Sequence, residues 1–269
     1  MKPGKFLLSA FVISMASVSI FCNAAPALNG LSEDSLTQSN TVVNNIIETK
    51  KQTPIKVEII EENGRYQLLR GGKPYQVKGA GIGSTDLASL VKFGGNSMRN
   101  WAVDNHAEPA QQDHPALLTW IIGNEVNFGF TNPKVFDAVN DTAKMIKAID
   151  PYHPTTTALA GFDKRALAAI QERAPDLDFV SFQLYADLLN LPKYIQDSGY
   201  DKPYFVTEWG AVGHWEVHKT EWGAPIENTS SEKANNYAKS YSQVLKPYSD
   251  KAIGNYVFLW GQKQEKTPT

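Results

Sequence analysis

Two short apolar stretches of the sequence each deliver a glutamate near their end, and these two residues are the first candidates for chemistry. Glu125 follows the run 117–124, and Glu208 follows the run Tyr-Phe-Val-Thr. Apolar, β-branched runs of this length are typical of parallel strands covered on both faces. Parallel-barrel enzymes keep their chemistry at the carboxyl ends of such strands. Two carboxylates placed in this way can act as the proton donor and the nucleophile or base of glycoside hydrolysis.

Each glutamate taken singly has an ordinary alternative, which is a salt bridge at the rim of the fold. The pair is more informative, because Asn124 precedes Glu125 and Trp209 follows Glu208. The stretches Gly-Asn-Glu and Thr-Glu-Trp-Gly resemble those of the retaining glycoside hydrolases whose (β/α)8 barrel carries Asn-Glu after strand 4 and a glutamate at the end of strand 7. Within that clan, residues 55–269 most resemble the catalytic barrel of glycoside hydrolase family 2.

This resemblance implies a role for each residue of the pair and for three neighbours. It implies that Glu125 is the general acid/base and that Glu208 is the nucleophile. Arg99 would hold the nucleophile, Asn124 would bind the sugar 2-hydroxyl, and Tyr185 would donate to the nucleophile. The alternatives are a surface arginine, a turn-forming asparagine and a core or rim tyrosine. The family implies a β-linked carbohydrate substrate, retention of configuration by hydrolysis or transglycosylation, and neither cofactor nor metal.

Tryptophans supply candidate sugar platforms, because flat aromatic faces suit the apolar faces of pyranose rings. Trp260 ends the last apolar run, and Trp209, Trp215 and Trp222 crowd the segment after Glu208. We therefore interpret that segment as a substrate wall. For any one tryptophan, packing in the core is the competing interpretation.

The elements that must position these residues alternate between strands and helices, which favours a parallel α/β fold. The expected strands are 75–81, 96–103, 117–124, 155–160, 178–185, 203–208 and 252–260. The expected helices are 84–93, 133–149, 163–173, 190–198 and 231–246. That gives about seven parallel strands, where a complete barrel has eight.

The missing unit is expected between the strands that end near Val103 and begin near Leu117. Residues 104–116 contain Pro109 and Pro115 and show no apolar period. A crossover between parallel strands needs about 10–12 residues by itself. The segment is therefore too short for a helix, a strand and a second helix, and the sequence predicts an incomplete (β/α)8 TIM-barrel domain over residues 75–269.

Residues 54–74 predict a small antiparallel β piece in front of the barrel. Asn63-Gly64 is a strong hairpin signal between two apolar runs, and Gly71-Gly72 forms a second turn. Residues 25–53 are rich in Ser, Asn and Thr and predict a polar linker. This piece is expected to cap the bottom of the barrel or to precede its first strand.

Residues 1–24 predict a secretory signal peptide. Lys2 and Lys5 form a basic start, an apolar run follows over 6–21, and small residues near Ala24 offer a cleavage site. The run is short for a membrane span, so we expect a periplasmic or secreted protein without a stable span after cleavage. Cys22 is the only cysteine and would leave with the signal. A net charge of −2 argues against a nucleic-acid partner.

Three other readings remain open at this point. A carbohydrate-binding remnant of such a barrel would keep the tryptophans but lose catalysis. The stretch 79–84, Gly-Ala-Gly-Ile-Gly-Ser, follows a strand like a phosphate-binding turn but lacks the third glycine of the dinucleotide fingerprint. His214 and His218 have a spacing of four residues, which is a weak metal signal inside a loop.

Overall fold

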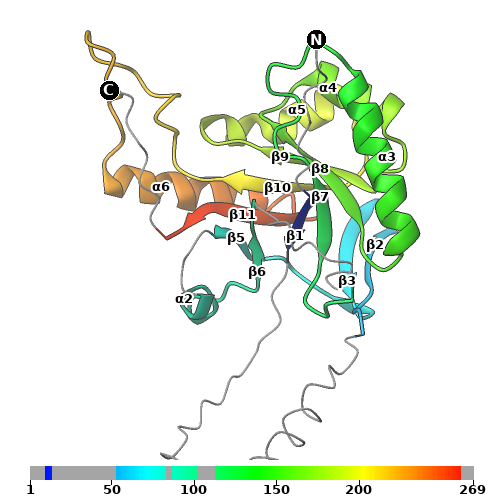
Figure 1. Ribbon diagram of the computed structural model, residues 1–269. Coiled ribbons are helices and arrows are strands. Elements are labelled where there is room, and N and C mark those ends of the chain that lie inside the picture. Colours follow the sequence, from blue (N-terminus) through cyan, green and yellow to red (C-terminus); the bar gives the residue numbers. More distant parts are fainter. Residues whose placement is uncertain (1–9, 14–52, 83–86, 102–112, 262–269) are drawn as a thin grey trace, which may run out of the picture.

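The computed structural model describes residues 10–13, 53–82, 87–101 and 113–261. A barrel containing seven parallel strands forms its centre (Figure 1). These strands are β5 (Gly79–Ile82), β6 (Ser97–Arg99), β7 (Thr119–Ile122), β8 (Thr155–Ala160), β9 (Phe179–Gln183), β10 (Tyr204–Trp209) and β11 (Ala252–Trp260). They lie in the order β6-β5-β11-β10-β9-β8-β7. The predicted α/β class and the predicted seven parallel strands are confirmed.

The parallel arrangement is interrupted between β6 and β7, as the short segment 104–116 predicts. The position between them holds β1 (Ala10–Ile13), which runs antiparallel to both neighbours. Ala10 pairs with Ile122, and Ile13 pairs with Arg99 and Thr119. The ring is therefore completed by a strand from the segment predicted as a signal peptide. Residues 102–112 and the predicted linker up to residue 52 lie outside the described residues.

Helices cover the outside of the barrel (Figure 1). They are α2 (Leu87–Lys92), α3 (Lys134–Ile149), α4 (Lys164–Arg173), α5 (Leu191–Ser198) and α6 (Ser230–Ser240), with a 3-10 turn η2 (Ala186–Asn190) and a π turn η3 (Tyr241–Leu245). Asp163 caps α4 by accepting hydrogen bonds from two backbone amides. Thr229 and Glu232 form a reciprocal capping box at the start of α6. The helix predicted over 231–246 is an α-helix up to Ser240 and continues as the π turn η3.

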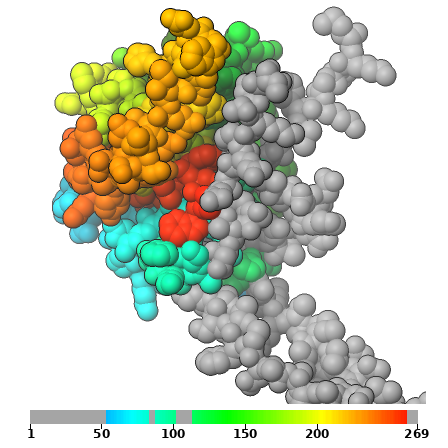
Figure 2. Space-filling model, turned by 90° about the vertical axis from the view of Figure 1, so that its left-hand side faces the viewer, coloured from blue at the N-terminus to red at the C-terminus, as the bar shows by residue number. Residues whose placement is uncertain are grey.

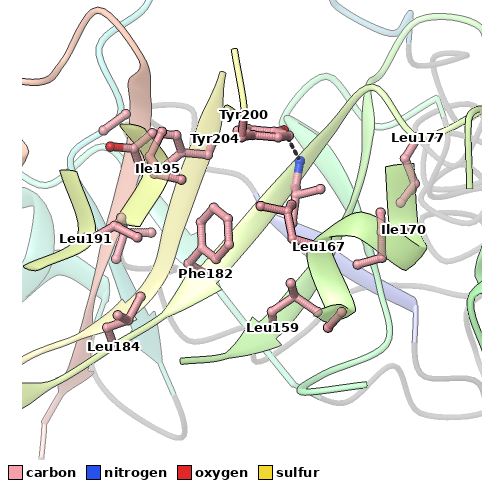
Figure 3. Close-up of a cluster of buried hydrophobic side chains, with 14 of the residues drawn as sticks. Leu159, Leu167, Ile170, Leu177, Phe182, Leu184, Leu191, Ile195, Tyr200 and Tyr204 are labelled. Carbon is pink, nitrogen blue, oxygen red and sulfur yellow. Dashed lines mark hydrogen bonds between the residues drawn. The ribbon is translucent and has the colours of Figure 1, made fainter. Parts of the chain in front are cut away.

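The main core lies between the barrel and these helices (Figure 3). Phe182 of β9 is fully buried, with Ile170 of α4 and Ile195 of α5 in the same cluster. The Tyr200 hydroxyl accepts a hydrogen bond from the backbone amide of Val180, at 3.1 Å. Burial of apolar area stabilises a fold by roughly 25 cal/mol per Å2, and this layer buries side chains of the strands and of the helices together.

The antiparallel sheet β2 (Val57–Glu62), β3 (Arg65–Arg70) and β4 (Lys73–Pro74) closes the N-terminal end of the barrel. Its hairpin turn has positive φ at Asn63 and Gly64, as the sequence signal requires. Val57 and Leu68 belong to the same buried cluster as Phe205, whose side chain fills the barrel interior. The expectation that this piece caps the bottom of the barrel agrees with the structure.

The glycines of the stretch 79–84 have a packing role inside the barrel. A Cβ atom at Gly79 would overlap the ring of Tyr256, and one at Gly81 would overlap the ring of Trp101. Both glycines lie within strand β5 and not in a turn before a helix. The described part of the stretch, which ends at Ile82, therefore belongs to the strand, and the turn of the phosphate-binding interpretation lies outside the described residues.

A groove of about 610 Å3 lies on the outer side of β5 and β11, between α2 and η3. Figure 2 shows this side of the molecule, with β11 between α6 and α2. Phe93, at the end of α2, is 72% exposed and contacts the ring of Trp260 at 5.9 Å.

Within the described residues, no helix is both long and apolar enough to cross a membrane.

Candidate active site

Glu208 lies near the end of β10 and is the centre of the candidate site. It is 7% exposed, and both of its carboxyl oxygens accept hydrogen bonds. Oε1 accepts from Arg99 Nη1 at 2.5 Å and from Trp101 Nε1 at 2.8 Å. Oε2 accepts from the Tyr185 hydroxyl at 2.8 Å. An ionised carboxylate is an acceptor only, so this set of donors matches a charged Glu208.

Arg99 ends β6 and is fully buried. Its guanidinium donates to Glu208, to the backbone carbonyl of Thr207 at 3.1 Å and, through Nη2, to Asn124 Oδ1 at 2.5 Å. Burial lowers the pKa of Arg99, and the contact with Glu208 opposes that effect. A guanidinium stays protonated in proteins, so the pair is a buried, charge-assisted contact.

Asn124 follows β7, and two donors hold its side-chain oxygen. Besides Arg99 Nη2, Gln183 Nε2 donates to Asn124 Oδ1 at 2.9 Å. Gln183 ends β9, is 3% exposed and is the Cα partner of Glu208 in the sheet. The carboxyl ends of β6, β9 and β10 and the loop after β7 thus converge on one polar cluster.

Glu125 lies in the loop directly after β7 and is half-buried. Its backbone has φ of 51°, in the left-handed region that residues other than glycine seldom adopt. Burial raises the pKa of Glu125, the nearby charge of Glu208 raises it further, and Arg99 acts in the opposite direction. A carboxyl with a raised pKa can keep its proton and act as an acid. A nearby carboxylate that accepts hydrogen bonds from three donors can act as a nucleophile.

Aromatic rings form one wall of the cluster. Tyr185 contacts Phe258 with ring centroids 5.9 Å apart, and Phe258 contacts Trp101 at 5.5 Å. Burial and the charge of Glu208 raise the pKa of Tyr185, so its hydroxyl remains a donor. Trp215 packs edge-on against Tyr185 at 5.2 Å while 56% of it stays exposed.

Glu216 fixes the loop that carries Trp215. Its Oε2 accepts from the backbone amide of Gly213 at 2.8 Å and from that of Ala186 at 3.2 Å. These bonds tie the loop after β10 to the start of η2. The Trp215 ring, which contacts Tyr185, therefore has a fixed place at the rim of the cluster around Glu208.

Of the other three tryptophans predicted to bind sugar, two face the outer side of the barrel and one lies on an exposed turn. Trp209 faces outward and packs against Tyr237 of α6, because neighbouring residues of a strand point to opposite faces. Trp260 packs with Ile82 and Leu90 on the outer side of β5. Both line the outer groove. Trp222 is 80% exposed, on a turn closed by the bridge between residues 219 and 225.

Sequence reasoning missed Trp101, Gln183 and Phe258. A side-chain period of two was the available signal, since Trp101 lies two residues after Arg99 and Gln183 two residues before Tyr185. Phe258 lies two residues before Trp260 but points to the other side. A register irregularity between Val257 and Trp260 explains this difference.

In the described part of the chain, no group of three or more His, Cys, Asp or Glu side chains could hold a metal ion. His214 packs edge-on against the ring of Trp215, at 5.0 Å. Within the described residues, the fold therefore brings no further metal ligands to His214 and His218.

Solved structures of glycoside hydrolases have a similar arrangement of elements. A calcium-binding mutant of Bacteroides uniformis beta-glucuronidase 2 has a TM-score of 0.51 and 17% identity, over 75% of this chain and 32% of that chain. A Bacteroides uniformis beta-glucuronidase has a TM-score of 0.49 and 17% identity, over 74% and 32%. A glycosyl hydrolase family 2 member from Bacteroides cellulosilyticus has a TM-score of 0.45 and 15% identity, over 76% and 30%.

The chain spans about a third of the length of these proteins. No protein-family model matches its sequence, and no curated protein does. At 17% identity, the first of these similarities shows a shared fold. The resemblance to barrel glycosidases that Gly-Asn-Glu suggests thus has a counterpart in three dimensions.

Proposed function

We propose that this protein is a retaining β-glycoside hydrolase or transglycosidase with Glu208 as nucleophile and Glu125 as general acid/base. One observation carries the proposal. Glu208 is held by Arg99, Trp101 and Tyr185, and burial and the charge of Glu208 raise the pKa of a second carboxyl, that of Glu125. This is the division of labour that glycoside hydrolysis requires of two carboxylates.

The proposed reaction has two steps. In the first, Glu208 attacks the anomeric carbon while Glu125 gives its proton to the leaving oxygen, which breaks the glycosidic bond and forms a glycosyl ester. In the second, Glu125 takes a proton from water, or from an acceptor hydroxyl, which attacks the anomeric carbon and releases Glu208. Arg99 and Tyr185 would stabilise Glu208 when it is charged at the beginning and end of this cycle.

The substrate class in this proposal is a β-linked carbohydrate. The fold shared with a beta-glucuronidase supports a glycoside as ligand. The exposed ring of Trp215 at the rim offers a surface for one face of a sugar.

We further propose export to the periplasm or the medium, from the signal-like residues 1–24. Mass spectrometry of exported protein that finds an intact Met1 would contradict export with cleavage.

A second candidate is a carbohydrate-binding protein without turnover. The observation that favours it is the interruption between β6 and β7, beside the strand that supplies Arg99. In this case the cluster would bind a sugar but fail to bring both carboxyls to one glycosidic bond. Binding of a glycoside without any hydrolysis would support it.

The test is a screen of aryl β-glycosides with the wild-type protein, followed by Glu208→Ala and Glu125→Ala. We expect Glu208→Ala to lower kcat by several orders of magnitude, because no covalent intermediate can form. Glu125→Ala should cost roughly 100- to 10,000-fold on glycosides with poor leaving groups. It should cost less on activated aryl glycosides, which need little protonation.

Added azide separates the two roles. In Glu125→Ala, azide should attack the glycosyl-enzyme and give a β-azide. In Glu208→Ala, azide should displace the leaving group directly and give the α-azide. The opposite stereochemistry would exchange the roles, and full activity in both variants would refute the assignment.

A further inference from the structure

The side-chain amide of Asn124 has a fixed orientation. Its Oδ1 accepts from Arg99 Nη2 at 2.5 Å and from Gln183 Nε2 at 2.9 Å. A guanidinium has donors only, so the oxygen of Asn124 must face Arg99. The same logic then fixes Gln183, whose NH2 group must face that oxygen.

The burial of Gln183 is energetically unfavourable if the side chain only fills space in the core. The residue is 3% exposed, and within the described residues its Oε1 has no hydrogen-bond partner. A buried acceptor without a partner is unfavourable, and an apolar side chain of the same length would avoid it. A glutamine at this position can donate a hydrogen bond to Asn124, and an apolar residue cannot.

Asn124 is exposed, unlike the two residues that hold it. With Oδ1 occupied twice, its Nδ2 group is the part left for a ligand, and it has no hydrogen-bond partner in the described part of the chain. The fixed amide therefore offers a donor beside Glu208.

We propose that Gln183 is a positioning residue that, with Arg99, fixes the Asn124 amide so that its NH2 group donates to a hydroxyl oxygen of the bound sugar. This inference rests on the proposed function of the site. Gln183 acts through Asn124 and does not touch the substrate.

The kinetic test is a double-mutant cycle with Gln183→Met and Asn124→Ala. Methionine keeps the length of glutamine and removes its donor. We expect Gln183→Met to lower kcat/KM by about tenfold in the wild-type background and to have little effect in the Asn124→Ala background. A loss of equal size in both backgrounds would overturn the proposal, because a purely structural role does not depend on Asn124.

A second test does not depend on turnover, and so separates this inference from the proposed function. The Asn124 NH2 signals in an 15N spectrum are those that disappear in Asn124→Ala. We expect their order parameter to be high in the wild-type protein and to fall below about 0.6 in Gln183→Met. The matched control Gln171→Met, on the exposed face of α4, should leave it unchanged.

The two tests together give a decision in every case. If the wild-type protein hydrolyses no glycoside, the proposed function fails and the spectrum still decides whether Gln183 orients Asn124. An unchanged order parameter in Gln183→Met would refute the inference even for an active enzyme. If Gln183→Met does not fold, Gln183→Leu is the second variant, because it also removes the donor without adding an acceptor, and the same fall is expected for Asn124.

Discussion

The buried pair of Arg99 and Glu208 is the residue-scale feature on which the site depends most. Arg99 is fully buried and Glu208 is 7% exposed, so removal of one charge leaves the other without its counter-ion. We expect Arg99→Met to reduce the free energy of unfolding by about 3–5 kcal/mol. Adding Glu208→Gln should recover much of the loss. Urea unfolding followed by circular dichroism measures both.

An exposed pair supplies the control for that prediction. Lys193 and Asp197 lie one turn apart on α5, and both side chains are mostly in solvent. Lys193→Met should change the free energy of unfolding by about 0.5 kcal/mol or less. Similar losses for Arg99→Met and Lys193→Met would contradict the importance given to the buried pair.

Glu125 links the site to the pH dependence of stability. Its pKa in the folded protein is raised above its ordinary value near 4.5 by burial and by Glu208. The folded state therefore holds the proton more tightly than the unfolded chain. The resulting stabilisation is complete below the unfolded pKa and is lost as the pH rises through the folded pKa.

Glu125→Gln should consequently be more stable than the wild-type protein at about pH 8 and lose this advantage at about pH 4. Urea unfolding at the two pH values gives the comparison. Glu172→Gln, on the exposed part of α4, is the matched control and should show no such difference. An advantage of Glu125→Gln that is independent of pH would contradict the raised pKa.

At the scale of elements, the start of α6 depends on its capping box. The Thr229 hydroxyl accepts from the Glu232 amide at 3.3 Å, and the Glu232 carboxylate accepts from the Thr229 amide at 2.7 Å. Thr229→Ala should reduce the free energy of unfolding by about 1 kcal/mol. Thr229→Ser keeps the hydroxyl and should cost much less, so equal losses in thermal unfolding would count against the cap.

The sequence predicts most of the elements because local signals mark them. For α4, Asp163 caps the start and Ala174-Pro175 marks the end, and the observed helix lies within one residue of the predicted one. The π turn after Ser240 and the strand β1 carry no such signal. An apolar run such as 6–21 is typical of a leader, and the same residue types are also compatible with a strand such as β1.

The candidate site was predictable to the extent that strand ends converge. Arg99, Asn124, Tyr185 and Glu208 come together because parallel strands deliver their ends to one edge of a barrel. The tryptophan wall was not predictable in the same way. Which face a residue such as Trp260 takes depends on a register irregularity that composition does not reveal.

At the scale of the whole molecule, the strand between β6 and β7 matters most. β1 supplies the only strand partner that β7 has on that side within the described residues. If residues 1–24 are removed, the facing edges of β6 and β7 lose their ladder bonds. We expect amide hydrogen exchange at Thr119–Ile122 to be faster in protein that starts at Ala25 than in protein that starts at Met1.

Strands β8 and β9 are the internal control for that experiment, because each pairs with parallel strands on both sides. Their protection should change less than that of β7. Equal protection of β7 in the two forms would show that the barrel does not need β1.

The hydrogen bond from Trp101 to Glu208 also places a fluorescent side chain at the centre of the site. The indole nitrogen lies 2.8 Å from Oε1, so the ultraviolet emission of this ring originates beside the carboxylate. A sugar that displaces water there alters the surroundings of the excited indole. Subtracting the emission spectrum of Trp101→Phe isolates that signal from the other tryptophans. The protein thus carries its own optical probe of occupancy, which reports binding whether or not a glycosidic bond is broken.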